Sequence, residues 1–185
     1  MAVFRLSPAN IFRRFRTNQK GAAAVEFAFV AVPFFALMFA IVEVALSFFF
    51  TQILETATAD AARLIMTGQV QAANMNQGQF RTQVCNRLPS LFDCTSGSVI
   101  VDVREAANFS GADVARMTEA FMTATPAYQP GVGGSIIIVR VGYKMPVWAN
   151  FYGASLATTS DGKMILMATS AFRNEPFLGG GLAPS

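Results

Sequence analysis

Two carboxylates at and within a long apolar run are the groups of this 185-residue chain whose position demands a chemical explanation. Glu26 stands directly before the run, and Glu43 is the only charged residue between Phe27 and Phe50. An unpaired charge at membrane depth costs several kcal/mol, so such carboxylates are expected to reach water, to find a partner or to serve a function. Glu43 could reach water at the outer interface or take part in a helix–helix contact, and the sequence favours neither.

Composition excludes several classes of function. The chain contains no histidine, the commonest general base and metal ligand, and its two cysteines cannot alone hold a structural zinc ion. Five of the basic residues lie in residues 1–21, which contain no acid, and the remainder holds nine basic and eleven acidic residues. A nucleic-acid binder would carry its basic residues on a folded face. We therefore expect no enzyme activity, metal, cofactor, small-molecule substrate or nucleic-acid partner.

The apolar run predicts one membrane-spanning helix. Its 24 residues, about 27–50, give about 36 Å of helix, enough to cross a hydrocarbon core of about 30 Å. Because basic residues crowd the N-terminal flank, residues 1–21 are expected to be a cytoplasmic leader and the chain beyond Thr51 to be periplasmic. A signal peptide cut near Ala59 is the alternative, but its apolar core would be shorter.

The helix is expected to continue beyond the membrane, over residues 22–68 in all, with Pro33 as a possible kink and Gly68 as the stop. Its outer half is amphipathic, with Gln52, Glu55, Thr58 and Arg63 off the apolar face. The residues predicted to cover a small domain are Ile53, Leu54, Ala57, Ala61, Leu64 and Ile65.

Three later runs, Ser98–Arg104, Ser135–Tyr143 and Lys163–Phe172, are rich in β-branched and apolar residues and predict strands. Short helices are expected around Phe80–Leu88 and Asp113–Met122. The predicted fold is α+β, with a long N-terminal helix, transmembrane and then amphipathic, packed on a small antiparallel sheet. Residues 69–176 would form the periplasmic domain, and residues 177–185 a flexible tail.

Cys85 and Cys94 are predicted to form a disulfide, because the periplasm is oxidising. The bridge would close a ten-residue loop and contribute about 2.7 kcal/mol in the chain-entropy model. Farther along, Trp148, Phe151 and Tyr152 form an aromatic cluster for which core packing is expected, with a partner-binding surface as the alternative.

The segment Lys20–Phe27, KGAAAVEF, resembles the processing site of type IV prepilins: a basic leader, a glycine, a glutamate five residues on and then an apolar helix. That resemblance implies a prepilin peptidase that cuts between Gly21 and Ala22, where a glycine leaves the backbone accessible. Cleavage would create an α-amino group at Ala22, four residues before Glu26 and on the same helix face. Near neutral pH this amine is largely charged and can pair with Glu26.

The stretch GAAAVEFAFVAVPFFALMFAIVE more specifically resembles the TadE-like family, in its Val-Glu-Phe-Ala motif, its later proline and its late acid, Glu43. The ending Ala171–Pro176, with Arg173, Glu175 and Pro176, is similar to the end of that family. We expect those residues to make a packing or subunit contact or to form a plain solvated ion pair.

The resemblance implies a pilin-like pseudopilin, a minor component of a Tad (tight adherence, Flp-type) pilus, in which Glu26 serves assembly. Its partners would be the inner membrane, the prepilin peptidase, other pilus subunits and the assembly machinery, and the chain could enter the extracellular filament. The alternatives are a TadF-like or type II secretion pseudopilin, and an uncleaved, membrane-anchored periplasmic binding module.

Overall fold

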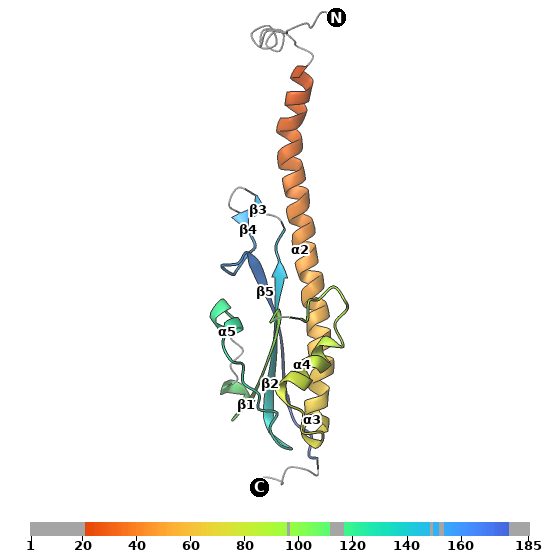
Figure 1. The fold of residues 1–185 in the computed structure, drawn as a ribbon, viewed down its shortest axis with the longest axis vertical. Coiled ribbons are helices and arrows are strands. Elements are labelled where there is room, and N and C mark those ends of the chain that lie inside the picture. The colour runs from red at the N-terminus through yellow and green to blue at the C-terminus, as the bar shows by residue number, and fades with distance from the viewer. Residues whose placement is uncertain (1–20, 96, 112–116, 149, 152–153, 178–185) are drawn as a thin grey trace, which may run out of the picture. The chain divides into compact units, whose positions relative to one another are not determined.

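The computed structural model describes residues 21–95, 97–111, 117–148, 150–151 and 154–177. The predicted leader, residues 1–20, lies outside the described residues. The chain forms two compact units, Met1–Val42 and Glu43–Ser185, here called unit 1 and unit 2. Within unit 2, the C-terminal part of a long helix lies beside a small sheet (Figure 1), which confirms the α+β prediction.

The long helix α2 runs from Ala22 to Met66 and contains Pro33. It ends two residues before Gly68, whose φ of 78° is left-handed and suits the predicted stop. Five of its unit 2 residues form an apolar face buried to 3% exposure or less: Leu54, Ala57, Ala61, Ala62 and Ile65. Ile53 and Leu64 pack at the edge of the same core, so the predicted amphipathic face is confirmed.

Thr58 is an exception to that prediction. We expected it off the apolar face, but it is only 1% exposed. Its hydroxyl donates a hydrogen bond of 2.7 Å to the carbonyl of Leu54, one turn earlier. The polar group is thus satisfied within the helix, which makes its burial inexpensive.

The main sheet has the strand order β1-β2-β5 and is antiparallel throughout. Its strands are β1 Val99–Ala106, β2 Ile136–Pro146 and β5 Lys163–Arg173, close to the three predicted runs. A second pair joins the two-residue strands β3 (Asn150–Phe151) and β4 (Ala154–Ser155). Because side chains alternate across a strand, β2 presents Ile137, Val139, Val141, Tyr143 and Met145 to the core that includes α2.

Short elements connect α2 to the sheet and cover it. They are α3 Gln69–Ala72, α4 Gln77–Cys85, the 3₁₀ turn η2 Phe109–Gly111 and α5 Glu119–Thr123. Asn76 caps α4 in a capping box with Gln79. Of the expected helix over Asp113–Met122, residues 113–116 lie outside the described residues. The described α5 begins at Glu119, after Thr118, an extended cap whose hydroxyl accepts the N–H of Phe121.

Candidate functional site

The predicted processing site lies where α2 begins. Gly21 directly precedes the helix, and Gly21, Ala22 and Glu26 are all exposed. Glu26 follows Ala22 by one helical turn, so the two lie on one face. A Cβ placed on Gly21 would meet no described atom within 4 Å, and its φ is not left-handed. Within the described residues, the fold thus gives no steric reason for a glycine at this position.

The described part of unit 1 is exposed except at Ala31, Ala36 and Ala40, which are partly buried. None of residues 21–42 is buried, and its exposed large side chains include Phe27, Phe29 and Phe34. The segment belongs to a helix that is long and apolar enough to cross a membrane, with a mean hydropathy of 2.5 over its most apolar window. Residues 22–42 alone give about 31 Å of helix, which matches a hydrocarbon core of about 30 Å.

Glu43 is the first buried residue of α2, with 4% of its surface exposed. Its carboxylate Oε1 accepts a hydrogen bond of 2.8 Å from the backbone N–H of Trp148, in the loop after β2. From the sequence we expected Glu43 either to reach water at the interface or to take part in a helix–helix contact. Neither expectation included this hydrogen bond to a loop of the sheet. Glu43 therefore ties α2 to the end of the sheet from which the Trp148 loop emerges.

The burial of Glu43 continues along one side of the helix. Ser47 and Phe50 are 8% exposed, and the Phe50 ring lies 4.9 Å from Phe92 and 6.3 Å from Tyr143, between centroids. The other side remains open, since Phe48 is 71% and Phe49 is 53% exposed. The last two turns of the predicted span are thus covered by unit 2 on one side only.

Trp148 is not a core residue. Its side chain is 62% exposed, which corrects the expectation of core packing. The physical reason is that Pro146 ends β2, so the chain leaves the sheet before Trp148 and only its backbone is tied to α2. Phe151 belongs to β3, and the Tyr152 of the same predicted cluster lies outside the described residues.

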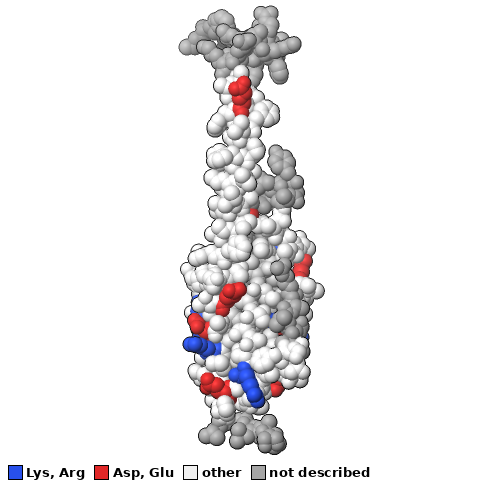
Figure 2. All heavy atoms as spheres, turned by 180° about the vertical axis from the view of Figure 1, so that it is seen from behind, with Lys and Arg blue, Asp and Glu red and all other residues white. Residues whose placement is uncertain are grey.

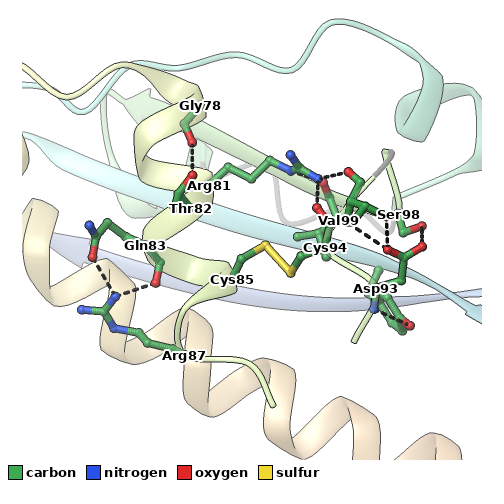
Figure 3. Close-up of a disulfide and its surroundings, with 12 residues drawn as sticks. Gly78, Arg81, Thr82, Gln83, Cys85, Arg87, Asp93, Cys94, Ser98 and Val99 are labelled. Atoms are coloured by element: carbon green, nitrogen blue, oxygen red, sulfur yellow. Dashed lines mark hydrogen bonds between the residues drawn. A yellow bond between two sulfur atoms is a disulfide. The ribbon is translucent and has the colours of Figure 1, made fainter. Parts of the chain in front are cut away.

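The structure contains the predicted disulfide, which joins Cys85 at the end of α4 to Cys94 across a Cα–Cα distance of 6.0 Å. Figure 3 shows the guanidinium of Arg81 reaching the same loop, where it donates to the carbonyls of Cys94, Thr95 and Val99 at 2.6 to 2.9 Å. The bridge and Arg81 together hold the loop against α4 and the start of β1.

Asp93 organises the C-terminal part of that loop. Its carboxylate accepts hydrogen bonds from the hydroxyl and the N–H of Thr95 and from the hydroxyl of Ser98 (Figure 3). These bonds, the Thr95 hydroxyl foremost, lower the pKa of Asp93 because they favour its charged form. The disulfide region is therefore a structural link between helix and sheet, as expected.

The ending Arg173–Pro176 is a packing element. The guanidinium Nε of Arg173 donates to the carbonyl of Gly134 at 2.8 Å, and the N–H of Glu175 donates to the carbonyl of Met66, at the end of α2, at 2.9 Å. Phe177, which we expected to begin a flexible tail, is half-buried: a Cβ on Gly68 would lie 2.6 Å from its ring. Residues 178–185 lie outside the described residues.

Asn174, between these residues, is the member of the ending that sequence reasoning missed. It is 2% exposed, and its amide Nδ2 donates to the carbonyls of Pro130 and Val132, at 3.0 Å each. Its backbone N–H and carbonyl bond to Ser135 and Gly134. The asparagine in this ending could have indicated such a role, because its side-chain amide can both donate and accept hydrogen bonds.

A buried ion pair on the sheet face opposite α2 was also missed. Arg140 donates to Asp102 at 2.8 Å, and the two side chains are 2% and 0% exposed. Arg104, which is 40% exposed, bonds to the same carboxylate at 3.0 Å, and the ring of Phe121 in α5 lies over both guanidiniums. Asp102 also accepts the N–H of Ala127 at 2.9 Å. The signal was one charge in the middle of two of the three predicted strands, Asp102 in Ser98–Arg104 and Arg140 in Ser135–Tyr143.

An open depression of about 650 Å³ lies at the edge of the sheet beside the ending. Its polar side chains are engaged within the protein: Ser135 donates to Glu105 at 2.5 Å, and Arg173 bonds to Gly134. Among the described residues, no group of three or more Cys, Asp or Glu is placed to hold a metal ion.

Comparison with known proteins identifies one similarity, which lies in α2. A family model described as TadE-like protein matches residues 21–63. The chain matches no curated protein and no solved structure. The match begins at Gly21, covers the exposed segment of α2 and about six turns of its unit 2 part, and includes both Glu26 and Glu43.

TadE-like pilus components are structural proteins, so the match supports a pilus-associated, minor pilin-like role. The exposed apolar helix is consistent with anchoring in a membrane. The resemblance seen in residues 20–50 is confirmed: residues 21–63 of the chain are similar to the TadE-like family.

Proposed function

We propose that this chain is a minor pilin or pseudopilin of a Tad (Flp-type) pilus, held in the inner membrane by α2 and processed by a prepilin peptidase after Gly21. One observation carries the proposal: the TadE-like match starts at Gly21, and α2 starts at the next residue, Ala22. A peptidase cut at this bond would leave the helix whole and would remove the basic leader, residues 1–21.

The glycine itself supports the cleavage site. Gly68 has a left-handed φ and lies against the ring of Phe177, and a Cβ on Gly142 would lie 2.6 Å from the sulfur of Met117. Gly21 has neither constraint among the described residues. A requirement outside the fold, such as backbone access for a peptidase, accounts for a glycine there.

Orientation follows from charge. The basic leader favours a cytoplasmic N-terminus, and unit 2 would then lie in the periplasm. The disulfide between Cys85 and Cys94 supports this placement, because disulfides persist in oxidising compartments. From this position the protein would join or prime the pilus, with the other subunits and the assembly machinery as its partners.

Glu26 would act in assembly. After cleavage, the new amine of Ala22 and the carboxylate of Glu26 lie one turn apart at the start of the membrane segment, where an unpaired charge is costly. A charged neighbour, in the same chain or in the next subunit, would offset that cost. Replacing Glu26 with Gln should leave membrane insertion intact and reduce the amount of assembled pili, measured by shearing and quantifying surface filaments. Wild-type filament levels in E26Q cells would refute this role.

The test of processing is the N-terminus of the mature protein, determined by mass spectrometry in strains with and without the prepilin peptidase. We expect a start at Ala22 only where the peptidase is present. Gly21→Leu should block the cut without disturbing the described fold, because its side chain would enter open space. Ala24→Leu, at an exposed position three residues on, is the matched control and should be processed normally.

An N-terminus at Met1 or Ala2 in both strains would favour the uncleaved membrane-anchored binding module instead. A processed chain whose loss spares the Tad pilus and affects a type II secretion system would favour the second alternative, a pseudopilin of that system. A TadF-like role would be separated from a TadE-like one by whether the other protein can replace it in a deletion strain.

A further inference from the structure

The apolar surface of α2 does not stop where unit 2 begins. Val44, Phe48 and Phe49 are 39%, 71% and 53% exposed, although Glu43, Ser47 and Phe50 on the other side of the helix are buried. Phe48 and Phe49 lie five and six residues beyond Glu43, or about 8–9 Å along the axis. This distance compares with the interfacial layer of a bilayer, about 5–8 Å on each side of the hydrocarbon core.

The backbone of Trp148 lies where α2 enters unit 2. Its backbone N–H is 2.8 Å from the carboxylate of Glu43, the first residue of α2 in this unit, and its side chain is 62% exposed. Since residue 42 is bonded to Glu43, the indole is attached close to the point where the apolar segment ends. Tryptophan is the residue that prefers the boundary between lipid headgroups and acyl chains.

Charged side chains begin a short way beyond this level. Lys163 pairs through its backbone with Pro146, two residues before Trp148, and its ammonium lies 3.3 Å from Asp161. On the face of unit 2 in Figure 2, Lys and Arg gather on the lower part, and the upper end is largely free of charge. The order along the unit, apolar and aromatic residues first and charges after, is that of a surface resting on a membrane interface.

We propose that Trp148, Phe48 and Phe49 form a lipid-contacting collar that seats unit 2 on the outer-leaflet interface of the bilayer crossed by the preceding segment. The partner is the phospholipid at the headgroup–acyl boundary. The bond between Glu43 and the N–H of Trp148 positions the loop, so that a carboxylate at the membrane boundary is satisfied by the same residue that contacts the lipid. The inference rests on the proposed membrane insertion of α2 and adds to it a defined depth for unit 2.

Trp148 is the only tryptophan in the chain, so the unmodified protein reports its own depth. The full chain is reconstituted into vesicles of phosphatidylethanolamine and phosphatidylglycerol that carry bromine on the acyl chains, either near the headgroup or near the terminal methyl. Bromine quenches indole fluorescence on contact. We expect a clear loss of emission with shallow bromine and little loss with deep bromine.

Two double variants provide the comparison. W148F/F48W moves the reporter to another member of the collar and should show the same quenching by shallow bromine. W148F/F109W moves it to Phe109, which is 56% exposed but lies beyond the opposite end of β1, where Ala106 pairs with Ile136 and Ile136 pairs with Arg173. Neither lipid should quench it.

Flotation on a density gradient separates the two levels of the proposal. Vesicle-bound protein in which Trp148 is as unquenched as the Phe109 reporter would overturn the collar and leave membrane insertion standing. Strongest quenching by deep bromine would also overturn it, because the indole would then lie in the hydrocarbon core. A chain that does not float with the vesicles would overturn membrane insertion itself, and the collar with it.

Discussion

The carboxylate of Glu43 and the backbone N–H of Trp148, 105 positions apart in the chain, are joined by a hydrogen bond of 2.8 Å. This bond connects the point where α2 enters unit 2 to the loop that leaves β2. The sequence places this carboxylate in an apolar run. In the structure it is buried by other residues of unit 2 and accepts its hydrogen bond from the backbone of Trp148, so it serves as a structural contact.

Glu43→Leu should release the Trp148 loop. A hydrogen bond to a charged group contributes about 1.5–3 kcal/mol, so amide exchange at Trp148 should quicken by about tenfold or more in hydrogen-exchange measurements on the detergent-solubilised chain. Glu43→Gln keeps an acceptor oxygen and should stay closer to wild type. Equal protection of Trp148 in wild type and E43L would show that the bond does not hold the loop.

The ending should depend on Asn174 more than on its charged neighbours. Asn174→Ala removes the two hydrogen bonds of its amide to the carbonyls of Pro130 and Val132, which keep their bonds to Gln71 and Ser135. Each lost bond contributes about 0.5–1.5 kcal/mol, so the free energy of unfolding should fall by about 1–3 kcal/mol. Glu175→Ala keeps the backbone bond to Met66 and should change it by no more than about 0.5 kcal/mol. Denaturant titrations followed by circular dichroism measure both. A larger loss in E175A than in N174A would mean that the carboxylate, not the amide, anchors this segment.

The buried ion pair should be far more sensitive than the exposed one. Asp102→Ala leaves the guanidinium of Arg140, which is 2% exposed, without its carboxylate, and breaking such a pair costs about 3–5 kcal/mol. Arg104 is 40% exposed, so Arg104→Ala should cost about 1 kcal/mol or less. The comparison uses the same unfolding assay. Similar losses in the two variants would argue that Asp102 and Arg140 do not form the dominant pair.

Loss of the disulfide should weaken the link between α4 and β1 without unfolding it. The double variant C85A/C94A should lose about 2.7 kcal/mol of stability, from the entropy of the ten-residue loop in the unfolded chain. Arg81 still bonds to three carbonyls of this region, so the native arrangement should persist. Adding Arg81→Ala should then raise hydrogen exchange in residues 86–98 beyond that of the double variant. Unchanged exchange there would show that Arg81 does not support the loop.

Much of the architecture could be predicted from local pattern. The 24-residue apolar run and the spacing of Leu54, Ala57, Ala61 and Ile65 predicted α2, and Gly68 predicted its end, because helix periodicity and a left-handed glycine are local properties. The strands followed from β-branched runs for the same reason. In the described part of the expected Asp113–Met122 helix, the boundary at Thr118 was missed, although threonine is a preferred N-cap residue.

The features of the candidate site also fall into those that local sequence determined and those that tertiary contacts decided. Gly21, Ala22 and Glu26 lie within six residues, and the sequence by itself determined their spacing, their order and the TadE-like character of the segment. Tertiary structure alone decided the partners of Glu43, Asn174 and Asp102, and the exposure of Trp148. These contacts join segments 38 to 105 residues apart, which are brought together by chain direction and sheet register, and no local pattern encodes either.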